Sequence, residues 1–374
     1  EMALSLMEGN EAIARGALAA GCRFFAGYPI TPATTVLNHM LNLLPPVGGI
    51  CLQAEDEIAS IGACLGASMS GLKVLTATSG PGISLYSEQI SFAVGSEISI
   101  VIVDVQRLGP STGSATRGAD GDVNFLRWGN SGGLPVIVLA PVNAADCFTL
   151  TVQAFNLAER FRCPVFLASN KEIAMTRESL DVAALQIPNL INRTAPPAGR
   201  PFLPFQVVED QSVPDFLPIG CNVPVRQTSS THGENGYITT DQQEIARILL
   251  RLKTKLESAI DTFSFCEHFK EGESDTLIIA YGVTARAAKS VYKEMAGAGK
   301  PVNLLILKTL WPVPENVIRK AAENVKRVVV VEMNLGQYVR EIERILGDKK
   351  VDFCGQMDGG LISPDKIREA VKNG

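Results

Sequence analysis

Over the first 170 residues, short apolar runs alternate with segments whose apolar residues recur every three or four positions. The runs are typical of strands buried on both faces of a parallel sheet, and the spacing between them is typical of amphipathic helices. The pattern predicts strands at residues 24–26, 73–77, 98–105, 135–139 and 164–168. It predicts helices at residues 9–20, 34–44, 58–70, 86–94 and 144–160, the last with Asn143 as its N-cap. This alternation indicates an α/β fold with a parallel sheet covered on both faces.

The pattern changes near Gln186, where prolines become frequent and periodicity is lost until about Thr239. Such composition is typical of an extended connector. A capping box at Thr240 and Gln243 then predicts a helix with the apolar stripe Ile245, Ile248, Leu249, Leu252, Leu256 and Ile260. A smaller α/β unit follows, with predicted strands at 276–281, 302–307 and 327–332 and helices at 284–295, 314–324 and 337–346. We therefore expect a first domain (1–190), a connector with a linking helix (191–265) and a second domain (266–374).

Composition and charge exclude several classes of protein. The 374 residues suffice for two domains with separate cores. A net charge of −5 without a long basic run argues against a nucleic-acid partner, and no apolar stretch has the length of a membrane span. The eight cysteines are scattered and form no Cys-x-x-Cys pair, so we expect no metal site built by this chain alone. Most lie in apolar segments, which predicts reduced core cysteines in a cytoplasmic protein.

Three loops follow directly on predicted strands, at residues 27–32, 78–82 and 106–116. Ligand sites in open parallel sheets lie beyond the carboxyl ends of strands, so we expect these loops to form a site. They would supply several hydroxyls and one cation, namely Thr31, Ser79, Thr112, Thr116 and Arg107. An arginine fork among hydroxyls suits a carboxylate ligand. The competing interpretation is a solvated Arg107 and glycines that only form turns.

Glu57 begins a predicted helix that is rich in small residues. Small side chains let another backbone approach closely, which suits a seam between subunits. Two interpretations of Glu55, Asp56 and Glu57 stay open at this point. One is that they match the positive end of the helix dipole, and the other is that one of them is aimed into the pocket as an acid–base group.

Several segments occur in order and at fitting intervals: Gly-Tyr-Pro-Ile-Thr-Pro at 27–32, the Glu57 helix, Thr-Ser-Gly-Pro-Gly at 78–82, and Gln-Arg-x-Gly-Pro-Ser-Thr-Gly at 106–113. With Leu-Trp-Pro-Val-Pro at 310–314 and Val-Glu-Met-Asn-Leu-Gly-Gln at 331–337, nearly the whole chain resembles the alpha subunit of a 2-oxoacid:ferredoxin oxidoreductase, most closely the 2-oxoglutarate type. The resemblance implies a parallel-sheet thiamine-pyrimidine-binding domain and a smaller transketolase C-terminal-like α/β domain. It implies oxidative decarboxylation of a 2-oxoacid to its acyl-CoA and CO₂, with electrons passed to ferredoxin.

The resemblance also implies roles for single residues. Glu57 falls where thiamine enzymes place the glutamate that hydrogen-bonds the aminopyrimidine ring and favours its imino tautomer. Thr31 falls at a threonine that contacts substrate, and Arg107 at the arginine that grips the substrate carboxylate. Thr112 and Thr116 fall at positions that serve the far end of the substrate. The expected cofactor-binding residues are Tyr28, Pro29, Ile30, Thr31, Glu57 and Ser79.

The resemblance implies a division of labour between chains. In this family a beta subunit carries the pyrophosphate-binding domain and a cluster, and a gamma subunit, here expected as a separate chain, completes the enzyme. The sequence has no convincing Gly-Asp-Gly motif followed by a metal-binding asparagine, and residues 118–122 are expected to form a polar turn. We therefore expect thiamine diphosphate to be shared with the beta subunit, and Mg²⁺ and iron–sulfur clusters to lie in partner subunits, among them a ferredoxin-like one. The isolated polypeptide is expected to be inactive.

One departure from the family pattern bears on the substrate. Residues 117–122 read Arg-Gly-Ala-Asp-Gly-Asp, where the usual 2-oxoglutarate subunits have a Lys-Thr-Glu-Gln-Gly-Asp-like stretch. The expected substrate is still 2-oxoglutarate, but a branched-chain 2-oxoacid such as 2-oxoisovalerate is the nearest alternative, and an aromatic 2-oxoacid also stays open. Two other functions stay open: a non-oxidative thiamine enzyme of the acetolactate synthase kind, and a scaffold subunit of a redox complex. His232 is expected to make local hydrogen bonds in a loop rather than to reach a site.

Overall fold

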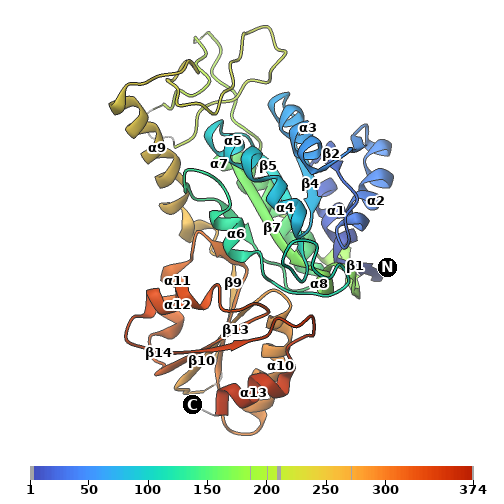
Figure 1. Ribbon diagram of the computed structural model, residues 1–374, viewed down its shortest axis with the longest axis vertical. Helices are drawn as coiled ribbons and strands as arrows, with labels where there is room; N and C mark the ends of the chain where they lie inside the picture. The colour runs from blue at the N-terminus through green and yellow to red at the C-terminus, as the bar shows by residue number, and fades with distance from the viewer. Residues whose placement is uncertain (1–3, 186, 200, 209–211, 271, 373–374) are drawn as a thin grey trace.

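The chain folds into two α/β bodies joined by a long helix and a connector (Figure 1). The computed structural model describes residues 4–185, 187–199, 201–208, 212–270 and 272–372, so Gln186, the predicted start of the connector, lies outside the described residues. In Figure 1 the connector forms the top of the molecule, and the helix α9 (Gln242–Glu257) descends along one side to the lower body. In the described part of the chain, no helix combines the length and the apolar character that crossing a membrane requires.

The upper body is built on a seven-stranded sheet with the spatial order β12-β6-β7-β5-β4-β2-β3. Neighbouring strands run parallel, except that β12 is antiparallel to β6. The strands are β2 (Phe24–Gly27), β3 (Ile50–Gln53), β4 (Val74–Thr78), β5 (Ile100–Gln106), β6 (Ile137–Leu139), β7 (Pro164–Asn170) and β12 (Thr309–Trp311). The five predicted strands are confirmed with small shifts at their ends. The pattern missed β3, and it missed β12, which comes from the segment assigned to the second domain.

Helices cover both faces of this sheet, as predicted, because alternate strand residues point into two separate apolar cores. One core is covered by α1 (Gly9–Ala19), α2 (Thr34–Leu43) and α7 (Ala144–Phe161). The other is covered by α3 (Glu57–Met69), α4 (Pro81–Leu85), α5 (Ser87–Gly95) and α6 (Val123–Trp128). The predicted helix at 86–94 is confirmed as α5, and the short helix α4 before it was not predicted. Asn143 caps α7 as predicted, since its side chain accepts a hydrogen bond from Asp146 N at 2.8 Å.

Smaller elements complete the upper body. The antiparallel pair β1 (Leu4–Glu8) and β8 (Arg177–Asp181) flanks α8 (Lys171–Met175). Single 3₁₀ turns occur at Pro45–Val47, Val182–Ala184 and Ile260–Thr262.

The lower body has a five-stranded sheet with the order β14-β13-β10-β11-β9, parallel except for β9. Its strands are β9 (Cys266–Phe269), β10 (Thr276–Tyr281), β11 (Asn303–Leu307), β13 (Arg327–Glu332) and β14 (Lys350–Gly355). Its helices are α10 (Thr284–Gly297), α11 (Glu315–Ala322), α12 (Val339–Leu346) and α13 (Pro364–Lys372). The predicted strands and helices of this unit are confirmed, and β9, β14 and α13 are additional. The division into three segments at 190 and 265 stays a prediction.

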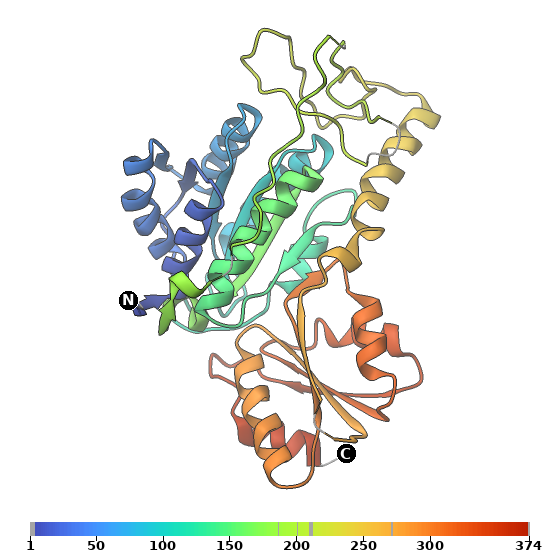
Figure 2. The same cartoon turned by 180° about the vertical axis from the view of Figure 1, so that it is seen from behind.

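The connector runs beside α7 and then over the top of the upper body (Figure 2). The described residues between 187 and 241 contain no helix or strand, in agreement with the extended segment that its prolines predict. The capping box was misplaced by one residue. Asp241 is the N-cap of α9 and accepts from Glu244 N at 2.8 Å, because a carboxylate one residue further on serves the free amides better than the Thr240 hydroxyl.

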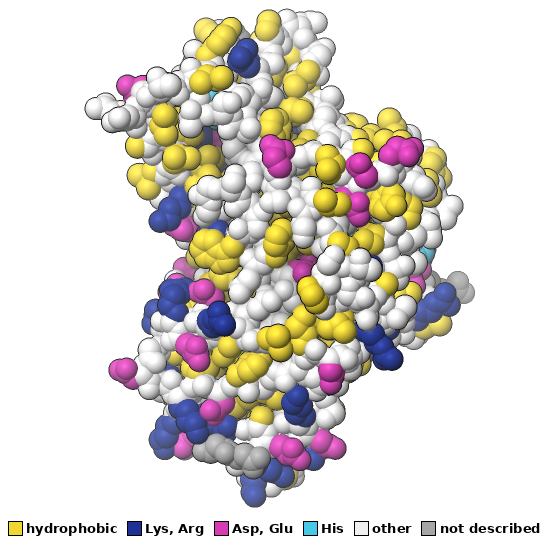
Figure 3. Space-filling model, viewed as in Figure 1, with side chains coloured by type: hydrophobic (Ala, Val, Ile, Leu, Met, Phe, Trp, Pro, Cys, Tyr) yellow, Lys and Arg dark blue, Asp and Glu magenta, His cyan; other side chains and the backbone are white. Residues whose placement is uncertain are grey.

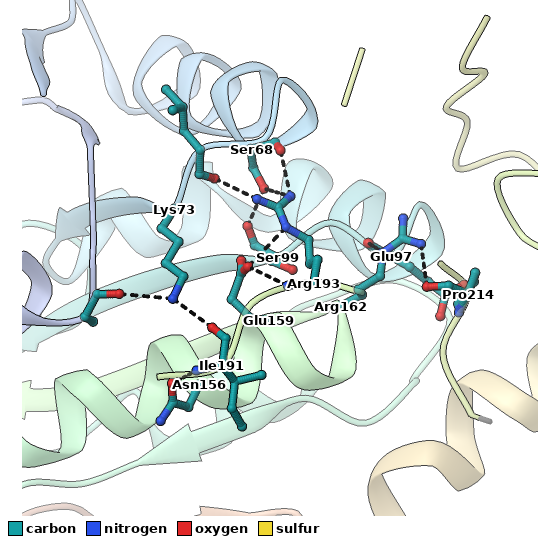
Figure 4. Close-up of polar contacts among 12 residues, drawn as sticks. Ser68, Lys73, Glu97, Ser99, Asn156, Glu159, Arg162, Ile191, Arg193 and Pro214 are labelled. Carbon is teal, nitrogen blue, oxygen red and sulfur yellow. Dashed lines mark hydrogen bonds and ion pairs between the residues drawn. The ribbon is translucent and has the colours of Figure 1, made fainter. Parts of the chain in front are cut away.

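Polar contacts fix the connector to the upper body (Figure 4). The Lys73 ammonium donates to Ile191 O at 2.8 Å. The Arg193 guanidinium donates to Glu159 Oε2 at 3.2 Å and to Ser68 O at 2.8 Å. Arg193 and Glu159 are both almost fully buried, so the connector is held by an ion pair that few waters reach.

Glu97, which is fully buried, ties α9 to the upper body. It pairs with Lys255 Nζ at 2.9 Å and with Arg251 Nη2 at 2.7 Å, both on α9. Its carbonyl accepts from Arg162 Nε at 3.1 Å. Burial alone would raise the pKa of Glu97, but Lys255, Arg251 and Arg162 hold it at about 2. The carboxylate therefore stays ionised and keeps the two segments together.

Candidate active site

Three loops meet at Arg107, at the carboxyl edge of the neighbouring strands β5, β4 and β2. Arg107 Nη1 donates to Thr31 O at 2.5 Å, which joins the loop after β5 to the loop after β2. A methyl group built on Gly80 would lie 3.3 Å from Arg107 Nε, so the loop after β4 lies against the same side chain. The geometry agrees with the expectation that strand ends in a parallel sheet bring these loops together.

Arg107 is buried, with 5% of its surface exposed. Its Nε has no hydrogen-bond partner among the residues that the structure describes. Burial lowers the pKa of Arg107, and the nearby Asp122 carboxyl opposes that shift. The interpretation of Arg107 as a solvated loop residue is therefore wrong. A buried guanidinium with an unused donor is a strong site for a carboxylate.

Glu57 is the first residue of α3, and its side chain is buried. The N-cap is its neighbour Asp56, whose carboxylate accepts from Ala59 N at 2.7 Å. Within the described residues, no hydrogen bond or ion pair engages the Glu57 carboxylate. A methyl group built on Gly82 would overlap Thr78 Oγ1 and lie 2.8 Å from Glu57 Oε1, so this carboxylate faces the turn after β4. Asp56 serves the helix end, and Glu57 is left free to act on a ligand.

Several buried polar atoms along this edge lack partners. Thr78 Oγ1 and Ser79 Oγ, like Arg107 Nε, meet no donor or acceptor in the part of the chain that the structure describes. Such atoms are rare in folded proteins, and a polar ligand would satisfy them. A carboxylate, hydroxyls and bare glycine backbone at Gly80 and Gly82 suit a flat heterocycle with ring nitrogens. The guanidinium suits an acidic substrate beside it.

The remaining predicted site residues lie at the rim. Tyr28 is exposed, Pro29 and Ile30 are half-buried, and the Thr31 side chain is exposed although its carbonyl binds Arg107. Their roles in binding stay predictions.

Thr112 and Thr116 are exposed on a loop closed by the bridge between Leu108 and Ser114. Within the described residues, neither side chain hydrogen-bonds to Arg107 or Glu57. These two threonines are thus close to Arg107 in the sequence, but the structure does not bring their hydroxyls into the site. Their roles stay predictions.

The segment at 118–122 is not the polar turn that we predicted. Asp120 is fully buried: Asn170 Nδ2 donates to its Oδ1 at 2.8 Å, and its backbone N–H donates to Met333 O at 2.9 Å. The segment docks against the lower body, because its carbonyls and amides find partners there rather than in solvent. Asn334 Nδ2, for example, donates to Asp120 O at 3.0 Å.

Sequence reasoning missed Asp104 and Asp122: both carboxyl oxygens of Asp104 and Oδ2 of Asp122 are buried without a hydrogen-bond partner among the described residues. Asp104 is fully buried in β5, and burial raises its pKa far above its usual range, with Asp122 adding to the shift. The available signal was an aspartate inside the apolar run Ile-Val-Ile-Val-Asp-Val-Gln at 100–106. An ionised carboxyl without a partner is costly to bury, which makes an aspartate in such a strand a signal worth noting.

His232 makes the local hydrogen bond that was expected, from Nδ1 to Ser230 O at 2.7 Å. Its ring lies on Phe205, with 3.8 Å between the ring centroids. His232 lines a cavity of about 150 Å³ between α5 and α9, which none of the strand-end loops reaches.

Large apolar side chains are exposed on the elements around Glu57. They are Tyr28, Leu52, Ile58 and Leu85, on the loop after β2, on β3, on α3 and on α4. In Figure 3 the Lys and Arg side chains gather mainly over the lower body, and hydrophobic side chains lie among acidic ones on the upper body. Exposed apolar groups around a site suit burial by another chain.

Comparison with known proteins decides the family. The family described as "Pyruvate flavodoxin/ferredoxin oxidoreductase, thiamine diP-bdg" matches residues 15–251, and "Pyruvate:ferredoxin oxidoreductase core domain II" matches residues 274–367. This chain belongs to the pyruvate flavodoxin/ferredoxin oxidoreductase family. The resemblance drawn from its sequence segments is therefore confirmed, as is the α/β architecture with a thiamine diphosphate-binding domain and a second, smaller domain.

Individual relatives in this family point the same way. The "2-oxoglutarate synthase subunit KorA" of Methanothermobacter marburgensis is 39% identical over 370 residues, which cover 98% of this chain and 97% of that protein. The "Ketoisovalerate oxidoreductase subunit VorB" of Methanothermobacter thermautotrophicus is 31% identical over 372 residues, 99% of this chain and 98% of that one. A solved 2-oxoglutarate:ferredoxin oxidoreductase from Magnetococcus marinus, with 2-oxoglutarate, coenzyme A and succinyl-CoA bound, matches with a TM-score of 0.94 and 32% identity. The match covers 99% of this chain and 65% of that one.

Proposed function

We propose that this oxidoreductase chain is the alpha subunit of an enzyme that converts 2-oxoglutarate and CoA to succinyl-CoA and CO₂, with electrons passed to ferredoxin. One observation carries the proposal: the buried Arg107, with an unused donor, lies on the same strand-end edge as the buried, unpaired carboxylate of Glu57. The names of the KorA relatives and the ligands in the Magnetococcus structure support 2-oxoglutarate as the substrate.

The orphaned hydroxyls and the free carboxylate fit thiamine diphosphate, which when bound supplies the electron sink for decarboxylation of a 2-oxoacid. In the proposal, Glu57 Oε1 holds a proton against the pyrimidine ring. The unpaired hydroxyl of Ser79 would hydrogen-bond to the cofactor, and the segment 28–31 (Tyr28, Pro29, Ile30 and Thr31) would line the ring.

Arg107 binds the substrate carboxylate through donors that the protein leaves free, while its bond to Thr31 O fixes the plane of the guanidinium. Thr31 contacts the reacting end of the substrate. Thr112 and Thr116, on the exposed loop above, bind the far end. A charge-assisted pair of this kind orients the substrate as well as binding it.

Partner chains complete the enzyme in this proposal. A beta subunit holds the diphosphate with Mg²⁺ and carries an iron–sulfur cluster. A gamma subunit and a ferredoxin-like subunit complete the enzyme, so that electrons from the oxidised 2-oxoacid reach ferredoxin. The exposed apolar groups around Glu57 and the small residues of α3 form the contact surface. Reduced cysteines with burial-raised pKa values, such as Cys64, fit a cytoplasmic complex.

A branched-chain 2-oxoacid is the second candidate substrate, because the ketoisovalerate oxidoreductase subunit also aligns over the full chain and the segment 117–122 departs from the 2-oxoglutarate pattern. The test is a 2-oxoacid panel on the co-purified complex, with thiamine diphosphate, CoA and a dye acceptor. We expect 2-oxoglutarate to give the highest kcat/KM. A higher kcat/KM for 2-oxoisovalerate or an aromatic 2-oxoacid would make that compound the assigned substrate. If no 2-oxoacid gave CoA-dependent dye reduction, the result would favour a scaffold subunit.

A further inference from the structure

Arg107 is held on both sides by a later part of its own loop. The residue after it, Leu108, donates its backbone N–H to Arg117 O at 2.8 Å. The residue before it, Gln106, accepts at Oε1 from Asp122 N at 2.9 Å. Both sequence neighbours of Arg107 therefore bind this later part of the loop, so its position sets the backbone from which the guanidinium extends.

The lower body binds the same segment (117–124) through the amide of Gln337. Gln337 lies two residues before the start of α12 and is half-buried. Its Nε2 donates to Gly121 O at 2.6 Å, and its Oε1 accepts from Asn124 N at 2.9 Å. The two hydrogen bonds lie on either side of Asp122 in the chain, so one amide of the lower body spans the residue that holds the arginine's neighbour.

Asn334 sets the position of that amide. It is fully buried, and its Oδ1 accepts from Gly336 N at 2.9 Å and from Gln337 N at 3.1 Å. Its Nδ2 donates to Asp120 O at 3.0 Å, so the turn that carries Gln337 is itself bound to the segment 117–124. A side chain whose own backbone is held in this way can fix a loop with little freedom left to it.

We propose that Gln337 is a positioning residue for Arg107, acting from the lower body through the segment 117–124 on the substrate site in the upper body. Among the described residues, the Arg107 guanidinium makes a single hydrogen bond, to Thr31 O, so its aim depends on the backbone behind it. A guanidinium displaced by about an ångström binds a carboxylate poorly, because such a pair needs a defined geometry. This inference rests on the proposed role of Arg107 in binding the substrate carboxylate, and Gln337 touches no substrate in this account.

The test is a double-mutant cycle on kcat/KM for the preferred 2-oxoacid, measured on the co-purified complex. Gln337→Met keeps the length of the side chain and removes both hydrogen bonds. We expect it to raise KM about 3- to 30-fold, with kcat within about threefold of wild type. In the Arg107→Met background no guanidinium is left to position, so the same substitution should change kcat/KM by less than about twofold.

The matched control is Asn316→Leu, in another amide of the lower body. Asn316 is exposed on α11, and its Nδ2 donates to Asp261 Oδ1 at 3.1 Å and to Asp261 Oδ2 at 2.9 Å. The substitution thus also removes two side-chain hydrogen bonds, but their partner lies outside the segment 117–124. We expect KM to stay within about twofold of wild type, since the change is not coupled to Arg107.

An unchanged KM in Gln337→Met, or an equal loss of kcat/KM in the wild-type and Arg107→Met backgrounds, would overturn the inference and leave the proposed function intact. If Gln337→Met does not assemble, Gln337→Glu replaces it, because at neutral pH its carboxylate can accept from Asn124 N but cannot donate to Gly121 O. A wild-type KM in that variant overturns the inference equally. A wild-type kcat/KM in Arg107→Met would remove the proposed role of Arg107 and this inference together.

Discussion

Replacing Arg107 by Met tests the substrate site, and the contacts of Arg107 give the expected size of the loss in kcat/KM. The variant removes a buried charge-assisted contact to the substrate carboxylate, worth about 1.5–3 kcal/mol, and the bond to Thr31 O, worth about 0.5–1.5 kcal/mol. The sum, about 2–4.5 kcal/mol, corresponds to a loss of about 30- to 2000-fold in kcat/KM. Arg107→Lys keeps the charge but loses the planar fork, so we expect an intermediate loss.

The assay is 2-oxoacid-dependent dye reduction by the co-purified complex at saturating CoA and thiamine diphosphate. The matched control is Arg247→Met, whose side chain is 60% exposed and pairs with the surface carboxylates of Glu234 and Glu244. A kcat/KM for Arg107→Met within threefold of the control would refute the reasoning and place the substrate carboxylate elsewhere.

Two further predictions concern the turn that contacts Glu57 and the ion pairs between Glu97 and α9. Gly82→Ala places a methyl group onto Thr78 Oγ1 and 2.8 Å from Glu57 Oε1, so we expect kcat to fall at least about tenfold. The control is Gly297→Ala, which has open space around the new methyl group and should keep wild-type turnover. Glu97→Gln leaves buried cations unpaired, so the free energy of unfolding of the complex, measured with urea, should fall by about 3–5 kcal/mol.

The same residue predicts a pH dependence. The pKa of Glu97 lies at about 2 in the folded chain, below its ordinary value of 4.5, so its stabilisation is complete above about pH 4.5 and is lost as pH falls toward 2. The difference between wild type and Glu97→Gln in urea should therefore shrink over that range. A difference that stays constant with pH, or one no larger than that of the half-exposed Glu257→Gln on α9, would contradict the prediction.

Local patterns predicted most of the elements, and the failures have physical causes. Strands such as β10 and β13 were predicted at their true bounds because fully buried parallel strands are apolar throughout. β3 was missed because it is a four-residue edge strand whose Ile50 and Leu52 are exposed. β12 was missed because its partner β6 lies about 170 residues earlier in the chain, and no local pattern reports such pairing.

The site was predicted as a set of loops but not as a set of contacts. Strand-end position predicted that Thr31, Gly80 and Arg107 would meet. It could not predict that Arg107 is buried, since a loop arginine is usually solvated, nor that residues 118–120 would be buried. The burial of that segment depends on its docking against the lower body, which is a tertiary event without a local signature.

The central claim is tested most directly by the turnover of Glu57→Gln in the assembled complex at saturating thiamine diphosphate. The amide keeps the size of the carboxylate but cannot hold and release the proton, so kcat should fall by about two to four orders of magnitude while the subunits still co-purify in the wild-type ratio. Turnover close to wild type in an intact complex would contradict the account, because the acid–base group would then have to lie outside this chain's α3.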